Sequence, residues 1–373
     1  MEFLPVIILV FSFLVLLTLG VPVAWCIAMS SMFTLMMAMP FSSATTTVSQ
    51  RIGTGLDSFA LLAIPFFILS GQIMSSGGIA HRLISFAKTL VGFLPGGLAL
   101  INIVSAMMMG AIAGSAMASA SAMGTILGPE MEKEGYSKEF GAAVNITSST
   151  TGLVIPPSNT LIVYSLASGG VSIAALFLAG YIPGILTGLF MMMVAIFWAK
   201  KHKYPVGKRS SLKEVFIKFV DAVPSLLLLV IVIGGIIGGV FTATEASAVA
   251  VLYTLLLSFY YKELSLKDLP KVILESTETT AIVMLLIGAS MCMSWVLSYE
   301  NIPQDISNLL LSVSDNKIII LLMINVILLA VGVFMDATPA VLIFTPIFLP
   351  IVTELGMDPT HFGIVLMLNL CIG

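Results

Sequence analysis

Hydrophobic residues in this chain form runs long enough to cross a lipid bilayer, separated by short polar segments. A helix needs about 20 apolar residues to span a membrane. Runs near that length lie at 3–19, 21–39, 58–76, 171–199, 223–241, 244–261 and 275–298. Residues 42–57 are polar and predict a connector, whereas residues 79–92 have apolar side chains at helical spacing and predict an amphipathic arm at the membrane interface. The pattern as a whole predicts an all-α polytopic membrane protein.

Two further runs, at 94–112 and 116–128, predict a re-entrant helical hairpin. At 1.5 Å per residue the second run reaches only about 20 Å, which is too short to cross a bilayer. The residues between the two runs are small, so we expect the tip of the hairpin near Gly114 and Ser115. The alternative is close packing of two helices through small residues, which is common in membranes.

The segment from Asn145 to Asn159 predicts a broken helix inside a long uncharged stretch. Five consecutive hydroxyl residues, 147–151, are followed by Gly152 and by the pair Pro156-Pro157. Proline lacks a backbone donor and pushes the preceding residue out of the helical region. Irregular backbone at membrane depth is tolerated where it lines a cavity or is buried in protein, as in transporters. The segment 139–168 therefore predicts a binding loop between two half-helices, and the alternative is a proline kink whose hydroxyls bond the preceding turn.

The last hundred residues repeat this pattern. A segment at 301–314 is followed by an arm at 318–335, a tip at 335–340 and a short arm at 341–352. Residues 349–356 match residues 128–135 at an offset of 221 residues, and Gly373 then falls opposite Gly152. The charge distribution makes the first repeat face inward and the second outward, which predicts an inverted-topology repeat. Because the second repeat stops before its expected break, we expect the natural chain to continue beyond Gly373.

Composition and charge narrow the class of protein. The chain has 373 residues, 58% of them hydrophobic and only 9% charged, and its net charge is −3. Most basic residues should face the cytoplasm, with Arg51 as an exception on the outside, and the basic segment 200–218 should lie at anionic membrane lipid. No phosphate-binding loop, dinucleotide fingerprint or nucleophile elbow is present, so we expect neither a soluble catalytic domain nor a nucleic-acid partner.

Polar groups inside the apolar segments indicate the chemistry of the site. Asp336 lies at the second hairpin tip next to Thr338, and an unpaired charge in the bilayer costs about 2.5–3.5 kcal/mol. Asp336 therefore needs a bound cation or donors at the tip; the alternatives are a neutral carboxyl and a carboxylate bonded to nearby backbone N–H groups. Hydroxyls, carbonyls and a carboxylate are hard oxygen ligands that suit Na⁺. Glu245 more simply favours the start of a helix, with Thr242 or Thr244 as the N-cap.

Four motifs together resemble the large membrane subunit of the tripartite ATP-independent periplasmic (TRAP) transporters, over essentially the whole chain. They lie at 114–124, 152–158, 239–249 and 336–340. The resemblance implies Na⁺-driven uptake of an organic acid, such as a C4-dicarboxylate or sialic acid, across the bacterial inner membrane. It also implies a periplasmic substrate-binding protein, a small four-span membrane subunit and an elevator motion of the ion-transporter-superfamily type. Residues 58–170 and 275–373 would then be the two transport repeats, and 1–57 and 171–274 the scaffold.

The resemblance also implies which residues bind. One Na⁺ would lie between the first hairpin and the break, and a second between the second hairpin and the segment after Gly373. The implied Na⁺ ligands are Gly114, Ser115, Ser119, Thr151, Gly152, Asp336 and Thr338. The implied substrate-binding residues are Asn145, Ser148, Ser149, Thr150, Pro156, Ser158 and Asn159.

Two other functions are compatible with part of the pattern. A stand-alone Na⁺/dicarboxylate symporter of similar fold would need no binding protein. An intramembrane enzyme would need a reactive His, Ser or Asp constellation, and the sequence contains no convincing one. A transporter is therefore the class that the sequence predicts.

Overall fold

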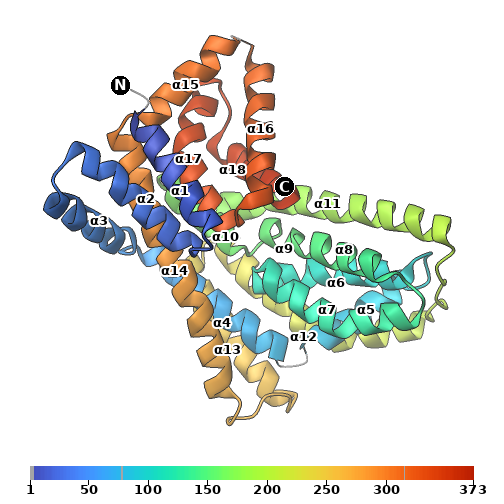
Figure 1. Cartoon of the computed structure of the whole chain (residues 1–373). Helices are drawn as coiled ribbons and strands as arrows, with labels where there is room; N and C mark the ends of the chain where they lie inside the picture. Colours follow the sequence, from blue (N-terminus) through green and yellow to red (C-terminus); the bar gives the residue numbers. More distant parts are fainter. Residues whose placement is uncertain (1–3, 77–78, 315) are drawn as a thin grey trace. The chain divides into compact units, whose positions relative to one another are not determined.

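A computed structural model describes residues 4–76, 79–314 and 316–373 (Figure 1). Within these ranges the chain forms helices and an isolated antiparallel bridge between Pro95 and Val206. The predicted all-α fold is confirmed. Among the described residues six helices are long and apolar enough to cross a membrane, or seven if the bent pair at 41–55 and 59–75 is one span.

The helices group into two compact units, each built from separate stretches of the chain. The first unit comprises Met1–Leu61, Ile162–Ser172 and Glu278–Gly373, and the second comprises Leu62–Leu161 and Ile173–Thr277. Two helices, α10 (Asn159–Ala167) and α14 (Leu269–Tyr299), continue from one unit into the other. The predicted division into scaffold and transport repeats depends on which helices move during transport, not on which helices contact each other. It therefore stays a prediction.

In the second unit a helical hairpin and a broken helix pack against longer helices. Its helices are α4 (Ala63–Ser76), α5 (Ile79–Val91), α6 (Gly97–Ala113), α7 (Ala116–Lys133), α8 (Lys138–Ser149), α9 (Thr151–Val154), α11 (Ile173–His202), α12 (Leu212–Ile237) and α13 (Ala243–Tyr260). Helices α6, α7 and α8 lie side by side, and α11 packs along α6 and α9 (Figure 1). Helix α13 packs on α4, and the cluster Ile73, Leu264 and Val272 is buried beside that contact.

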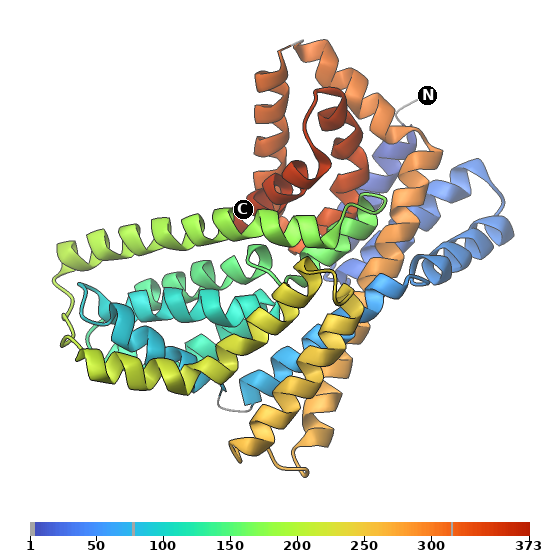
Figure 2. The same ribbon diagram turned by 180° about the vertical axis from the view of Figure 1, so that it is seen from behind.

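The first unit contains the N-terminal helices and the second hairpin. Its helices are α1 (Leu4–Thr18), α2 (Val23–Ala38), α3 (Phe41–Gly55), α15 (Ile302–Val313), α16 (Lys317–Phe334), α17 (Ala337–Glu354) and α18 (Pro359–Ile372). Helix α18 packs against both arms of the hairpin, α16 and α17, which Figure 2 shows from behind. The Tyr164 hydroxyl donates to the carbonyl of Pro359 at 2.5 Å, and the same ring fills the space beside Gly363.

Two predicted elements differ from the structure. The polar connector is a helix, α3, because its apolar Ala44 and Val48 lie one turn apart and are buried together while its hydroxyls face outward. Helix α7 continues beyond the apolar run of 13 residues to Lys133 and has 18 residues, about 27 Å, but it is not among the described helices that are long and apolar enough to cross a membrane, so re-entry stays a prediction. Hydropathy measures the apolar run, and a helix continues through polar residues once it emerges from its apolar surroundings.

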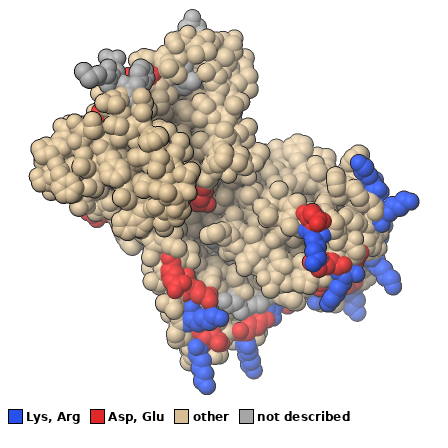
Figure 3. All heavy atoms as spheres, viewed as in Figure 1, with Lys and Arg blue, Asp and Glu red and all other residues tan. Residues whose placement is uncertain are grey.

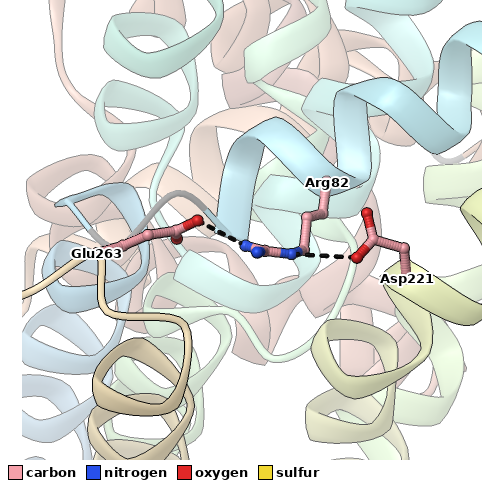
Figure 4. Close-up of polar contacts among 3 residues, drawn as sticks. All are labelled: Arg82, Asp221 and Glu263. Atoms are coloured by element: carbon pink, nitrogen blue, oxygen red, sulfur yellow. Dashed lines mark hydrogen bonds and ion pairs between the residues drawn. The ribbon is translucent and has the colours of Figure 1, made fainter.

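The amphipathic arm α5 is held by an ion-pair network (Figure 4). Its apolar side packs on α6 and α12. On its polar side the Arg82 guanidinium lies 3.4 Å from Asp221 of α12 and donates to Glu263 at 2.8 Å. The same guanidinium stacks over the ring of Tyr261, 3.5 Å from its centroid. Arg82 thus fastens α5 to two neighbouring segments, while its side chain is only 19% exposed.

Candidate functional site

The tip of the first hairpin is a tight helix-to-helix turn at Gly114 and Ser115. Gly114 has a positive φ of 59°, a left-handed conformation that glycine adopts without strain. Ser115 caps α7, and its hydroxyl accepts from the N–H of Ala118 at 3.4 Å. Across the hairpin the Ser119 hydroxyl donates to the carbonyl of Ala106 at 3.3 Å. The predicted tip is confirmed, and α6 and α7 pack as antiparallel arms.

Both ends of this hairpin lie at the same segment of the chain. Pro95, before α6, forms the bridge with Val206. Tyr136, after α7, stacks on Tyr204 with ring centroids 4.3 Å apart, and the N–H of Ser137 donates to the Tyr204 hydroxyl at 3.4 Å. Burial raises the pKa of Tyr136 to about 12, so its phenol stays neutral. The hairpin therefore enters and leaves by one end of its unit, as re-entry into a bilayer requires.

Basic side chains gather at that end. Arg209 lies over the ring of Phe93, 5.0 Å from its centroid, and Lys201 lies over Trp198 at 5.9 Å. On the face shown in Figure 3, Lys and Arg side chains lie in separate groups with Asp and Glu among them, while wide areas carry no charged group. This distribution agrees with the basic face that the sequence predicts.

The predicted break in the helix lies at residues 155–158. Helix α9 ends at Val154, and α10 begins at Asn159. The Ser158 hydroxyl spans the gap: it donates to the carbonyl of Leu153 at 2.6 Å and accepts from the N–H of Leu161 at 3.4 Å. Two prolines in the gap, neither with an N–H, explain why the helix cannot continue.

The break is seated on glycines of the long helix α11. A side chain at Gly180 or Gly184 would collide with Val154, Ile155 or Pro156, so α11 approaches the break closely only because these positions are glycine. Gly180 and Gly184 are the eighth and twelfth residues of α11, about 10–17 Å from its start. Because α11 is long enough to span a membrane, this contact supports a break at membrane depth.

The hairpin tip meets the break. A Cβ added to Gly114 would lie 2.9 Å from the carbonyl oxygen of Pro157 and 3.6 Å from Cγ of Asn159. The side-chain oxygen Oδ1 of Asn159 is buried and has no hydrogen-bond partner among the described residues. One turn before the tip, Gly110 contacts Gly152 backbone to backbone. The structure thus brings together two segments that the sequence predicted as one site, with an unsatisfied oxygen at their junction.

The other predicted polar residues of the broken helix bond within the protein. Ser149 donates to the carbonyl of Asn145 at 2.7 Å, Thr150 to that of Thr147 at 2.8 Å, and Thr151 to that of Ser148 at 2.6 Å. These are the bonds of a kinked helix, so the break and the back-bonded hydroxyls coexist.

An open cavity lies beside the broken helix. Its volume is about 250 Å³, and it is lined by Asn145 of the predicted substrate residues and also by Asn102, Gly124, Glu132 and Lys138.

The second hairpin tip is capped by Asp336. Its carboxylate accepts from the N–H of Thr338 at 3.3 Å and begins α17. One turn before the tip, Gly332 contacts Gly373 backbone to backbone, as Gly110 contacts Gly152 in the first repeat. Asp336 is exposed within the chain. The backbone-bonded alternative for Asp336 is therefore observed, and its second oxygen stays available.

Glu245 has the capping role that the sequence favoured. Its carboxylate accepts from the N–H of Thr242 at 2.8 Å and from the Thr242 hydroxyl at 2.9 Å. In return the Thr242 hydroxyl accepts from the N–H of Glu245 at 3.3 Å, which completes a capping box at the start of α13.

Sequence reasoning missed two asparagines in the hairpin arms. Asn102 of α6 accepts at 3.0 Å from the buried Ser148 hydroxyl, and Asn325 of α16 accepts at 2.6 Å from Asn369 of α18. The sequence does contain a signal for these two residues, because each is the single amide side chain in a mostly apolar hairpin arm.

Comparison with known proteins gives the family. The model of the family "Tripartite ATP-independent periplasmic transporter, DctM component" matches residues 10–373. The chain is 55% identical to the uncharacterized protein YgiK of Salmonella typhimurium over 99% of this chain and 85% of that protein. It is 42% identical to the C4-dicarboxylate TRAP transporter large permease protein DctM of Pseudomonas aeruginosa, over 85% of this chain and 74% of that one. It is 37% identical to the sialic acid TRAP transporter large permease protein SiaM of Vibrio cholerae, over 98% and 85%.

A solved structure shares the fold. The YdaH transporter of Alcanivorax borkumensis superposes with a TM-score of 0.58 over 88% of this chain and 76% of that one, at 13% sequence identity. The family match, the relatives and the apolar helices agree. The chain belongs to the DctM family of tripartite ATP-independent periplasmic transporters and is a multi-pass protein of the inner membrane.

Proposed function

We propose that this chain is the transport subunit of a Na⁺-coupled importer of organic acids. Relatives named for C4-dicarboxylate and sialic acid transport support an organic anion as the substrate. In this proposal a periplasmic binding protein delivers the acid, and a small four-span subunit completes the membrane complex. The hairpins and the broken helices move as an elevator against the remaining helices.

The observation that carries the proposal is the junction of the first hairpin tip with the break. Leaving a buried amide oxygen unsatisfied costs about 1–3 kcal/mol, and a cation bound at the Asn159 oxygen would offset this cost. The carbonyl of Pro157 lies at the same junction beside Gly114. Both are hard oxygen donors of the kind that Na⁺ prefers. Asn159 is therefore our first candidate Na⁺ ligand, together with the predicted residues at Gly114, Ser115, Ser119, Thr151 and Gly152.

A second Na⁺ would bind at the tip of the other hairpin. Asp336 supplies a carboxylate oxygen that the helix cap does not use, and Thr338 lies at the start of the same helix. A carboxylate at this position gives the Na⁺ a full counter-charge inside a weakly polar environment. The carboxylic acid itself would bind near the first break, where half-helix N-termini favour anions.

Uptake into proteoliposomes tests the proposal. The complex of this chain with its small subunit would be reconstituted, and uptake of radiolabelled succinate and sialic acid measured with and without an inward Na⁺ gradient and the binding protein. We expect uptake of at least one acid that needs both. Na⁺-driven uptake without the binding protein would instead indicate a symporter that needs no binding protein, and uptake indifferent to Na⁺ would refute the coupling.

A further inference from the structure

The two repeats share a contact pattern between the first arm of the hairpin and the helix that packs on it. In the first repeat, Asn102 of α6 accepts from Ser148 of α8 at 3.0 Å. In the second, Asn325 of α16 accepts from Asn369 of α18 at 2.6 Å. Ser148 and Asn369 differ by 221 residues, the offset of the repeat, and each lies four residues before the glycine of the backbone contact.

Each contact pair lies at a similar distance from its hairpin tip. Gly110 and Gly332 both lie four residues, about one turn, before the tip residues Gly114 and Asp336. The asparagines lie a further eight and seven residues back, about two turns. Each first arm is therefore held against its partner helix at two points, a polar bridge and a close glycine contact.

We propose that Asn102 and Asn325 are positioning residues that fix the register of each hairpin against the helix that packs on it, α8 in the first repeat and α18 in the second. A slip of one residue would move the arm by about 1.5 Å and turn it by about 100°. A glycine contact alone is apolar and tolerates such a slip, whereas an amide bridge has one partner. Asn102 and Asn369 are 1% and 8% exposed, so an amide that loses its partner at this depth leaves a buried polar group unsatisfied, and the bridge selects one register.

The first bridge extends to the second arm. Asn102 also donates to the side-chain oxygen of Asn145 at 3.5 Å, and Asn145 donates to the carbonyl of Ala120 in α7 at 2.9 Å. Asn102 is 1% exposed and Ser148 is fully buried. The network thus ties both arms of the hairpin to α8, so that tip and break keep one relative position.

The repeat provides its own matched variants. Asn369→Ser gives the second repeat the hydroxyl donor that the first repeat has, whereas Asn369→Leu keeps the size of the side chain and removes the bridge. Asn102→Leu removes the bridge in the first repeat. Asn308→Ala, on an exposed face of α15, is the control.

Hydrogen exchange of the complete membrane complex tests positioning directly. We expect Asn102→Leu to speed exchange at the tip around 110–118, and Asn369→Leu at 331–340, each without affecting the other tip. Asn369→Ser and Asn308→Ala should match the wild type. Unchanged exchange in both leucine variants, or a rise spread evenly over the whole chain, would overturn the proposal.

Na⁺ dependence of uptake gives a second readout, which depends on the proposed function. We expect the Na⁺ concentration for half-maximal uptake to rise about threefold to tenfold in the leucine variants, since each displaces a tip that forms a binding site. A merely structural role would lower the amount of folded protein without moving this value. A wild type that takes up acid without Na⁺ would refute the coupling, and the exchange experiment would still decide whether the asparagines position the hairpins.

Discussion

At the residue scale, the hairpin tip and the break meet at a polar atom that the described residues leave without a hydrogen bond. Ser149 and Thr151, in the broken helix, bond carbonyls of their own preceding turn. Ser158 bonds across the break. Asn159 differs, because its Oδ1 is buried at the hairpin tip and accepts no hydrogen bond from the described residues. A sequence shows which residues are polar, but only packing shows which polar atoms are buried without a partner.

Replacing Asn159 separates stability from ion binding. Asn159→Leu removes a buried acceptor without a partner, so we expect the melting temperature of the purified complex to stay equal or rise. If the oxygen binds Na⁺, the Na⁺ concentration for half-maximal uptake should rise by about tenfold or more, the loss of one ligand costing about 1.4 kcal/mol or more. Thermal unfolding and uptake would be measured on the same preparation. A variant with lower stability and unchanged Na⁺ dependence would show that the oxygen has a structural role only.

Asp336 allows a similar separation, because its cap and its charge can be removed independently. Asparagine caps helices about as well as aspartate, whereas alanine loses about 1 kcal/mol. We therefore expect Asp336→Asn to keep the melting temperature but to raise the Na⁺ concentration for half-maximal uptake. Asp336→Ala should raise that Na⁺ concentration and also lower the melting temperature. Equal Na⁺ dependence in Asp336→Asn and the wild type would remove Asp336 from the ion site.

At the element scale, polar contacts at helix ends fix elements that are apolar along their length. The capping box of Thr242 and Glu245 begins α13. In α18 the cap is Asp358, and hydrogen bonds from the backbone N–H of His361 and from Thr360 hold the pKa of its carboxyl below the usual range. The same type of cap, Ser137, begins α8 at an offset of 221 residues. Helix boundaries in both repeats are thus set by equivalent residues.

The arm α5 depends on Arg82 in the same way. Arg82→Gln would leave Asp221 and Glu263 without their shared cation. Because the Arg82 side chain is 19% exposed and its partners are 44% and 31% exposed, solvent screens the pairs, and we expect a loss of about 1–2 kcal/mol, less than for a fully buried pair. The control Lys271→Gln removes a pair whose lysine is 81% exposed and should cost less than about 0.5 kcal/mol. The melting temperatures of the wild type, Arg82→Gln and Lys271→Gln would be measured in the same detergent. Equal melting temperatures for Arg82→Gln and Lys271→Gln would contradict an anchoring role of Arg82.

At the scale of the whole molecule, the two repeats have the same order of elements. An amphipathic helix, α5 or α15, precedes a hairpin, and the hairpin precedes the helix that packs on it. The turns after the hairpins have equivalent left-handed glycines, Gly135 and Gly356, with φ of 85° and 81°. The first hairpin with α8 lies in one unit and the second hairpin with α18 in the other, so the predicted opposite orientation of the repeats rests on the charge distribution along the sequence.

Labelling with an impermeant maleimide tests that orientation. In a background with Cys26, Cys292 and Cys371 replaced, Lys133→Cys and Glu354→Cys place exposed thiols at the ends of α7 and α17. We expect only the second to be labelled in right-side-out spheroplasts, and both after permeabilisation, because the positive-inside rule places Lys133 in the cytoplasm. Labelling of both variants in intact spheroplasts would refute the inverted repeat.

The sequence determined the helical membrane fold, the tip at Gly114, the break before Asn159 and the Glu245 cap, because hydropathy, glycine and proline act locally along the chain. It mispredicted the connector at 42–57 and the length of α7, because polar residues continue a helix that packing has already begun. The meeting of Gly114 with Asn159, the unsatisfied oxygen there and the asparagine bridges were decided only by tertiary structure. Each joins residues on different helices, and which helix faces meet depends on how the helices pack.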